Sequence, residues 1–159
     1  MRGRKKRGEG FSLLEVVIGI ALVAIAVLGL AEMFTLGVLN NLRAERIANA
    51  SFLAQQQIDI MRNLTVDEFT ALTTSNGIDL NGDGAMDILK DEPLDINNDG
   101  QFDYRRITEI QVDASGASLS FKIDVFIFSR EQLNAPKDEL LLNPIRSGVR
   151  SKITTAISR

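Results

Sequence analysis

The sequence predicts an α+β fold, in which a long N-terminal helix packs through its second half on a small antiparallel β-sheet head. Two patterns early in the chain support the helix. An apolar run from about Phe11 to Phe34 carries only Glu15 and Glu32 as charged residues, and residues 35–64 keep a helical period. The last third alternates apolar and polar residues, as strands with one buried face do. One amphipathic helix over three or four strands gives the α+β class.

Composition limits what the protein can do. With 159 residues, of which 45% are hydrophobic, the chain is long enough for one domain with a buried core. There is no Cys and no His, which excludes disulfides, thiolate or imidazole metal sites, and nucleophile–histidine catalysis. Carboxylate pairs such as Asp79 and Asp83 could do acid–base work, but they stand in loops that look like metal sites, with no evident pocket, so we expect no enzymatic activity. The net charge of −3 argues against nucleic acid as the main partner.

The charge is divided unevenly along the chain. Five basic residues in residues 1–10 against Glu9 make this leader +4, which leaves −7 for residues 11–159. Because basic flanks of membrane segments stay in the cytoplasm, we expect a cytoplasmic N-terminus and an exterior head.

The apolar run is long enough to cross a membrane. At about 1.5 Å per helical residue, residues 11–34 span roughly 36 Å, more than the bilayer core. The run is longer than the apolar part of a secretory signal, and no small-residue cleavage site follows it. The pattern alone therefore predicts a membrane anchor.

The stretch KKRGEGFSLLEVVIGIALVAIAVLGL resembles the N-terminus of type IV prepilins and of the related type II secretion pseudopilins. The shared features are a basic leader ending in Gly, an aromatic residue, Ser, two aliphatic residues and a Glu. The resemblance implies that a prepilin peptidase cuts between Gly10 and Phe11 and that the new amine of Phe11 is N-methylated. It is specific over residues 5–34, loose over 35–64 and only architectural beyond.

Glu15 is the one acid in the first half of the apolar run. A carboxylate costs about 2.5–3.5 kcal/mol at the centre of a membrane helix, and it is normally retained for a partner. The resemblance implies an assembly role, in which Glu15 pairs with the N-terminal amine of a neighbouring subunit. The alternative is that Glu15 lies at headgroup depth without a role. No Pro precedes Pro93, so local melting of the helix on assembly is not expected.

Residues 35–64 predict an amphipathic continuation of the same helix, ending near Asn63. Its apolar stripe recurs at three- to five-residue steps and consists of Leu39, Leu42, Ile47, Ala50, Ala54, Ile58 and Met61. This part also resembles minor pilins more than major filament subunits. An irregular segment is expected at residues 67–76.

Two Asp-rich loops lie within residues 79–103. Both read D-x-N-x-D-G-x-x-D at a spacing of 16 residues, and side chains at alternate positions of such a tight loop converge on a hard cation such as Ca²⁺. The predicted ligands are Asp79, Asn81, Asp83, Ala85 and Asp87 in the first loop and Asp95, Asn97, Asp99, Gln101 and Asp103 in the second. Ala85 and Gln101 would contribute their backbone carbonyls, and the others their side chains. We expect one or two calcium ions.

The loops depart from a full EF-hand. Its twelfth position is a bidentate Glu, but Lys90 and Arg106 stand there. Asp91, Glu92 or Glu109 are candidates to complete the coordination. The alternative is a pair of solvated Asx turns without a metal.

The last third predicts antiparallel strands over about residues 106–158. Arg106–Asp113 forms one strand, residues 114–118 a hairpin turn, Leu119–Phe128 a second strand, and Val149 to about Ser158 a third. Phe126 and Phe128 lie on the face opposite the aliphatic residues. We expect them to cover a second core, and the alternative is that they mark a subunit contact. The predicted parts are a cleaved leader (1–10), a membrane or filament-core helix (11–34), its amphipathic continuation (35–64) and a globular head (65–159).

The predicted function is a structural subunit, a minor pilin of a type IV pilus or related filament, whose head calcium stabilises. Its partners would be other pilin subunits and prepilin peptidase. Before assembly it would sit in the inner membrane as a single-pass protein, with the head periplasmic or extracellular. One alternative is a type II secretion pseudopilin. Another, of a different class, is a membrane-anchored calcium-binding or adhesion module that does not polymerise.

Overall fold

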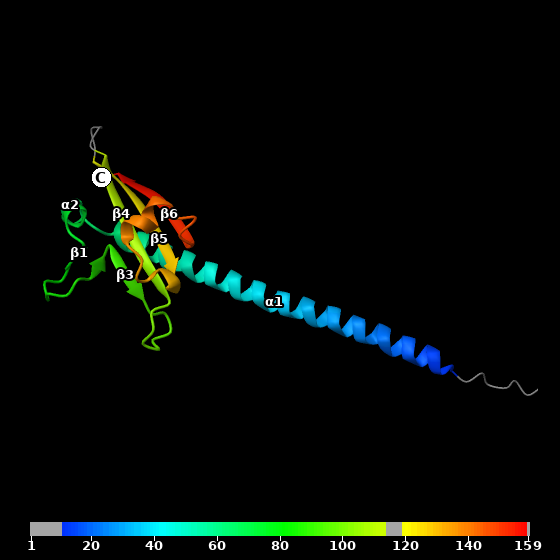
Figure 1. The fold of residues 1–159 in the computed structure, drawn as a ribbon. Coiled ribbons are helices and arrows are strands. Elements are labelled where there is room, and N and C mark those ends of the chain that lie inside the picture. Colours follow the sequence, from blue (N-terminus) through cyan, green and yellow to red (C-terminus); the bar gives the residue numbers. More distant parts are fainter. Residues whose placement is uncertain (1–10, 114–118, 159) are drawn as a thin grey trace, which may run out of the picture. The chain divides into compact units, whose positions relative to one another are not determined.

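The computed structural model describes residues 11–113 and 119–158. The chain divides into two compact units, one up to Arg43 and one from Ala44 onward. One helix, α1 (Leu13–Arg62), runs through both (Figure 1). The leader, including Gly10, and the hairpin turn at 114–118 lie outside the described residues.

In the first unit, α1 buries none of its side chains. Every residue from 11 to 43 is exposed, including aliphatic residues such as Leu28, 70% exposed. An 18-residue window of α1 has a mean hydropathy of 2.8. The helix is therefore long and apolar enough to cross a membrane, and the predicted long N-terminal helix is confirmed.

The second unit contains a four-stranded antiparallel sheet in the order β3-β4-β5-β6. Its strands are β3 (Asp91–Leu94), β4 (Tyr104–Asp113), β5 (Ser120–Ser129) and β6 (Val149–Ser158). The three strands expected in the last third are confirmed, and β3 adds a fourth. The register between β5 and β6 shifts at Ile127 and Phe128, which marks a β-bulge.

One face of this sheet packs on helices. Ala50, Ala54, Ile58 and Met61 of α1 join Phe69 and Leu72 of α2 (Val66–Thr74) and the inward residues of β5 in a single core. The rings of Phe69 and Phe121 stack with centroids 4.7 Å apart. The buried stripe of α1 begins at Ala50, so Leu39, Leu42 and Ile47 of the predicted stripe are exposed instead.

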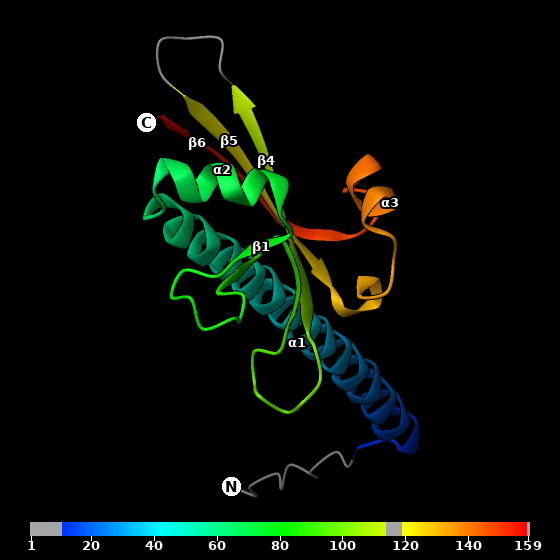
Figure 2. The same cartoon turned by 90° about the vertical axis from the view of Figure 1, so that its left-hand side faces the viewer.

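The opposite face has its own smaller core. Phe126 and Phe128 of β5 pack with Ile107 of β4 and Leu140 of α3 (Lys137–Leu142). Figure 2 shows α2 and the C-terminal part of α1 on one side of the strands and α3 on the other. A short 3₁₀ turn, η1 (Arg130–Gln132), follows β5. The expected second core beneath Phe126 and Phe128 is present.

The irregular segment expected at 67–76 is wrong, because most of it is α2. Thr65 caps this helix: the backbone N–H of Glu68 donates to the Thr65 hydroxyl, and Glu68 accepts from the backbone N–H of Thr65 at 2.6 Å. This reciprocal capping box satisfies two backbone donors that would otherwise lack partners. The Thr-x-x-Glu signal was present in the sequence.

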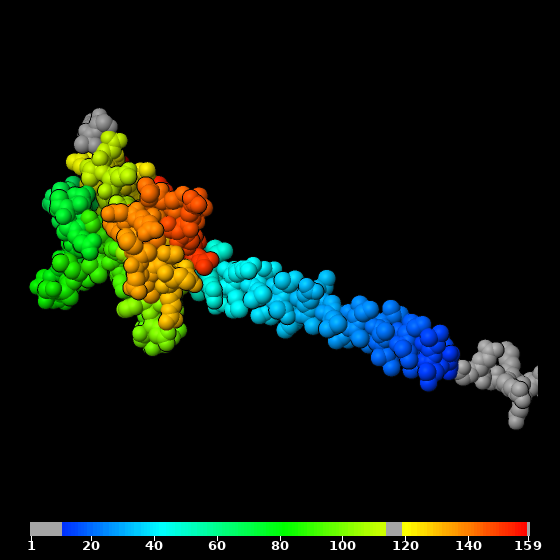
Figure 3. Space-filling view, viewed as in Figure 1, coloured from blue at the N-terminus to red at the C-terminus, as the bar shows by residue number. Residues whose placement is uncertain are grey.

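Two further short strands, β1 (Gly77–Ile78) and β2 (Ile88–Leu89), pair antiparallel and hold the first Asp-rich loop. The second loop connects β3 to β4. Both loops are therefore the ends of β-hairpins. In Figure 3 they project from the second unit as separate green lobes.

Candidate functional site

Glu15 lies in the first turn of α1. The carbonyl of Ser12 accepts from the backbone N–H groups of Glu15 and Val16, at 3.0 and 3.2 Å. A carboxylate in this turn is favoured by the helix dipole, whose positive end lies there. Phe11 precedes the helix and is 82% exposed.

The two Asp-rich loops share most of their hydrogen bonds. In the first, Asp79 Oδ2 accepts from the N–H of Gly84 at 2.8 Å; in the second, Asp95 Oδ2 accepts from Gly100 at 2.8 Å. The same correspondence holds for four further bonds, in which the acceptors are Asn81, Asp83 and Asp87 in the first loop and Asn97, Asp99 and Asp103 in the second.

The equivalence extends to the backbone. The N–H of Asp87 donates to the carbonyl of Ile78 at 2.9 Å, and that of Asp103 to Leu94 at 2.8 Å, again 16 residues on. Gly84 and Gly100 both have positive φ, as the sharp turn requires. The sequence repeat is thus a structural repeat.

The comparisons with known proteins bear on the N-terminal end. A family model described as the prokaryotic N-terminal methylation motif matches residues 5–31. No curated protein and no solved structure matches the chain. The chain carries a type IV prepilin-like methylation signal. The signal supports a subunit of the type IV pilin or pseudopilin type, and the long helix followed by a four-stranded antiparallel sheet is a pilin-like α+β architecture.

The two Asp-rich loops differ at one atom. Asp79 Oδ1 accepts backbone N–H groups from Asn81 at 3.2 Å and from Gly82 at 2.7 Å. The equivalent atom, Asp95 Oδ1, is buried and has no hydrogen-bond partner in the structure. An unsatisfied buried carboxylate oxygen is costly, and a cation would satisfy it. The donor set of the second loop therefore fits a hard cation.

Further observations indicate which oxygen atoms could coordinate such an ion. Within residues 11–113 and 119–158, no group of three or more acidic side chains is close enough to hold a metal by itself. Amide oxygens of Asn and backbone carbonyls would have to contribute, as is common for Ca²⁺. The backbone N–H groups of Gly84 and Gly82 hold the pKa of Asp79 below its ordinary value, so this carboxylate stays charged.

The three acids considered as additional ligands are engaged elsewhere. Arg105 binds Asp91, Arg106 binds Glu92, and Lys137 binds Glu109 at 2.6 Å. These pairs tie β3 to β4 and α3 to β4. A cation in either loop would therefore be completed by loop oxygens and water.

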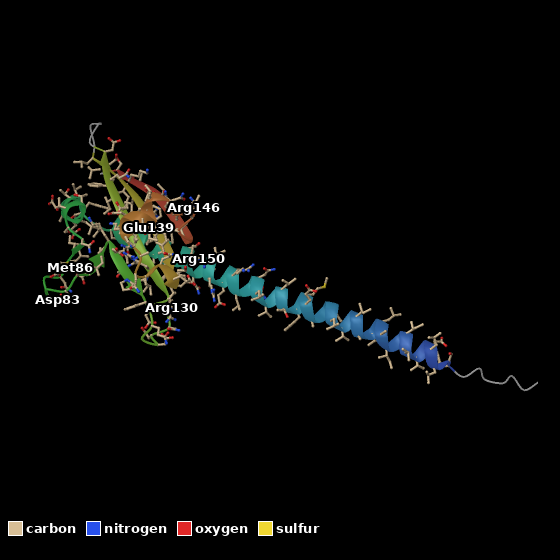
Figure 4. All side chains as sticks on the ribbon, in the orientation of Figure 1. Asp83, Met86, Arg130, Glu139, Arg146 and Arg150 are labelled. Atoms are coloured by element: carbon tan, nitrogen blue, oxygen red, sulfur yellow. The ribbon has the colours of Figure 1, made fainter. Side chains whose placement is uncertain are left out.

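Sequence reasoning missed a polar cleft beside the second loop. It has a volume of about 510 Å³, and Arg46, Arg130 and Arg150 are among its lining residues. Arg130 and Arg150 are labelled in Figure 4, and Asp83 marks the outer end of the first loop there. The three arginines are too far apart in the sequence for any local pattern to join them.

Proposed function

We propose that this protein is a minor pilin, a structural subunit that prepilin peptidase processes between Gly10 and Phe11 and that assembles through α1 into a type IV pilus or a related filament. The observation that carries the proposal is the methylation motif at residues 5–31, at the start of a helix whose first part buries none of its apolar side chains. A type II secretion pseudopilin shares these features and is the closest alternative.

Glu15 has a defined part in this proposal. A helix that leaves lipid for a filament core takes its carboxylate into a poorly solvated environment, where an unpaired charge is unfavourable. The N-methylated amine of Phe11 on a neighbouring subunit would neutralise it. No catalytic role is proposed for Glu15 or for the loops.

The first experiment replaces Glu15 with Gln in the full chain and measures the subunit in membrane and sheared-filament fractions. We expect normal membrane insertion and loss from the filament fraction. Glu32→Gln is the control, because Glu32 is the other acid of the apolar run and should tolerate the change. Unchanged entry of the Glu15→Gln variant into filaments would favour the membrane-anchored binding module instead.

The second experiment determines the N-terminus. Mass spectrometry of the protein from cells that contain prepilin peptidase should give a chain beginning at N-methylated Phe11. Retention of Met1 in those cells would contradict the proposed processing.

We also propose that calcium stabilises the head. Support comes from the orphaned Asp95 Oδ1 and from the loop geometry shared by both repeats. Asp95, Asn97, Asp99, Asp103 and the carbonyl of Gln101 would hold the ion in the second loop, and their counterparts Asp79, Asn81, Asp83, Asp87 and Ala85 would do so in the first. When bound, the ion would neutralise acids that repel one another.

A thermal melt of the full chain in detergent tests this. A ligand that binds only the folded state raises the melting temperature, and extracellular calcium sites bind at about 10⁻⁴–10⁻³ M Ca²⁺. We expect an increase in millimolar Ca²⁺ that a chelator reverses. An unchanged melt would favour metal-free Asx turns.

A further inference from the structure

The cleft beside the second Asp-rich loop, here called the arginine cleft, is built from separate parts of the second unit. Arg46 and Asn49 come from α1, Tyr104 from β4, Arg130 from η1 and Arg150 from β6. Tyr104 is 7% exposed, and its phenol donates to the carbonyl of Arg46 at 3.2 Å. This bond fixes the α1 wall of the cleft to the sheet.

The β-bulge places Arg150 in the cleft. Ser151 pairs with Ile127 and Val149 with Phe128, which leaves Arg150 as the extra residue. Ser151 faces α1, since Ser51 of α1 donates to its hydroxyl at 3.3 Å, and Arg150 lines the cleft with Arg46 of the same helix. In a regular strand two consecutive residues would face opposite sides. Bulges often redirect a side chain in this way next to binding sites.

In the part of the chain that the structure describes, none of the three guanidinium groups has an acidic partner within ion-pair distance. Arg130 donates to the side-chain carbonyl of Gln101 at 2.7 Å. Among the described residues, no carboxylate oxygen lies within 4.0 Å of the side-chain nitrogens of Arg46 or Arg150. Like charges in one cleft repel each other, and an anion between them would remove that repulsion.

Glu131 lies in the field of these arginines without contacting them. The hydroxyl of Ser129 is the main cause that holds the pKa of Glu131 low, and the charges of Arg150 and Arg46 lower it further. Glu131 is therefore already held by Ser129 and does not bridge the two guanidinium groups.

The other acids of the cleft limit the kind of anion. Glu45, Asp103 and Glu131 also line the cleft. Their three negative charges equal the three positive charges of the arginines, so the lining has no formal net charge. The phosphates of a continuous polyanion such as nucleic acid would be repelled by these acids. A single carboxylate flanked by neutral or basic groups would avoid that repulsion. Guanidinium groups bind a carboxylate through paired hydrogen bonds, a geometry that a single acidic side chain provides.

We propose that the arginine cleft binds one carboxylate side chain of a neighbouring polypeptide, held between Arg46 and Arg150. The identification of this neighbour as a filament subunit rests on the proposed function; the binding of a carboxylate does not. The cleft would then be a second assembly contact, carried by the head.

The test converts the contact into a covalent bond. Arg150→Lys and, separately, Arg46→Lys keep the positive charge and provide an amine. A water-soluble carbodiimide activates a touching carboxylate, the lysine Nζ attacks the activated carbonyl carbon, and an amide forms as the urea leaves. Arg146→Lys is the control, because Arg146 lies close in sequence but does not line the cleft. Full-length variants are treated in membranes and in sheared filaments, and the linked residues are mapped by mass spectrometry.

We expect the lysines introduced by Arg150→Lys and by Arg46→Lys to link to the same Asp or Glu of another chain, with a yield several-fold above that of the Arg146→Lys control. Replacing that mapped acid by its amide should abolish the link. Links only to Glu131 or Glu45 of the same chain, or equal yields from all three variants, would overturn the proposal. The protein could also form the link in membranes and yet be absent from filaments. That result would support carboxylate binding by the cleft and contradict the proposed filament function.

Discussion

Arg105 donates from Nε and Nη2 to the two carboxylate oxygens of Asp91, each at 2.8 Å. The pair lies diagonally across β3 and β4, and the Arg105 side chain is only 12% exposed. Its Nη1 also donates to three carbonyls of the segment after β5, those of Gln132, Leu133 and Ala135. One guanidinium thus joins the edge strand β3 to the segment that leads into α3.

Asp91→Asn should destabilise the head. The substitution removes the bidentate partner of a largely buried cation, whose pKa the Asp91 hydrogen bonds hold above its ordinary value. We expect a loss of about 2 kcal/mol in the free energy of unfolding, in the range of hydrogen bonds to charged groups. Denaturant unfolding of the full chain in detergent, followed by Tyr104 fluorescence, measures it.

Asp59→Asn is the matched control for that measurement. Asp59 pairs with Arg62 at 3.5 Å on α1, and both side chains are more than half exposed. Exposed pairs contribute about 0–1 kcal/mol, so the change should be small. Equal losses in the two variants would contradict the role assigned to Arg105 and Asp91.

Thr65→Ala should weaken α2. It removes the hydroxyl that accepts from the N–H of Glu68, and loss of such a cap costs about 1 kcal/mol. Thr70→Ala is the comparison, since Thr70 lies inside the same helix and its hydroxyl only donates to the carbonyl of Val66. Thermal unfolding should show a lower midpoint for Thr65→Ala alone. A lower midpoint for Thr70→Ala of the same size would argue against the capping box.

The capping box also predicts a pH dependence. The backbone N–H of Thr65, and then its hydroxyl, hold the pKa of Glu68 below its ordinary value of 4.5. A carboxyl with a lowered folded-state pKa contributes stability above its unfolded pKa and loses it as the pH falls through the folded-state value. Melting temperatures should therefore fall more steeply for the parent chain than for Glu68→Gln as the pH drops below 4.5. Parallel curves would contradict the assignment.

The tandem loops provide an internal comparison for calcium. Tyr104 is the only tyrosine, the chain has no tryptophan, and Tyr104 directly follows the second loop. Ca²⁺ entering that loop should change Tyr104 fluorescence. Asp99→Ala should abolish the change, whereas Asp83→Ala, the equivalent substitution in the first loop, should leave it. Mg²⁺ at the same concentration is the ion control. Loss of the response in Asp83→Ala alone would assign the signal to the first loop.

Much of the fold could be predicted because its signals are local. The helix from Leu13 to Arg62 follows from an unbroken apolar run and a continued period, and β6 begins at Val149, as the alternation of its residues predicted. The capping box at Thr65 and Glu68 is also a local signal, but it stands in a stretch rich in Thr and Asn, a composition that favours irregular structure. Strands of two residues such as Gly77–Ile78 are too short for any periodicity.

The candidate sites also divide into those built from contiguous residues and those that only the fold brings together. The methylation motif is contiguous, and so is each Asp-rich loop, so all could be read from the sequence. That Asp91, Glu92 and Glu109 are bound by basic residues depends on the register of β3 and β4 and on the position of α3. The arginine cleft joins residues about 100 positions apart, and one of them is placed by a bulge.

The 16-residue offset between the two hairpins also bears on changes in chain length. Ile78 pairs with Ile88 as Leu94 pairs with Tyr104, so removing residues 79–94 would connect Ile78 directly to the second loop in the place of Leu94. Sixteen is an even number, and strand side chains alternate with a period of two, so the inward and outward faces would keep their order. Loss of a whole repeat would therefore keep the alternation of the strand, but it would also remove Asp91 and Glu92, the partners of Arg105 and Arg106.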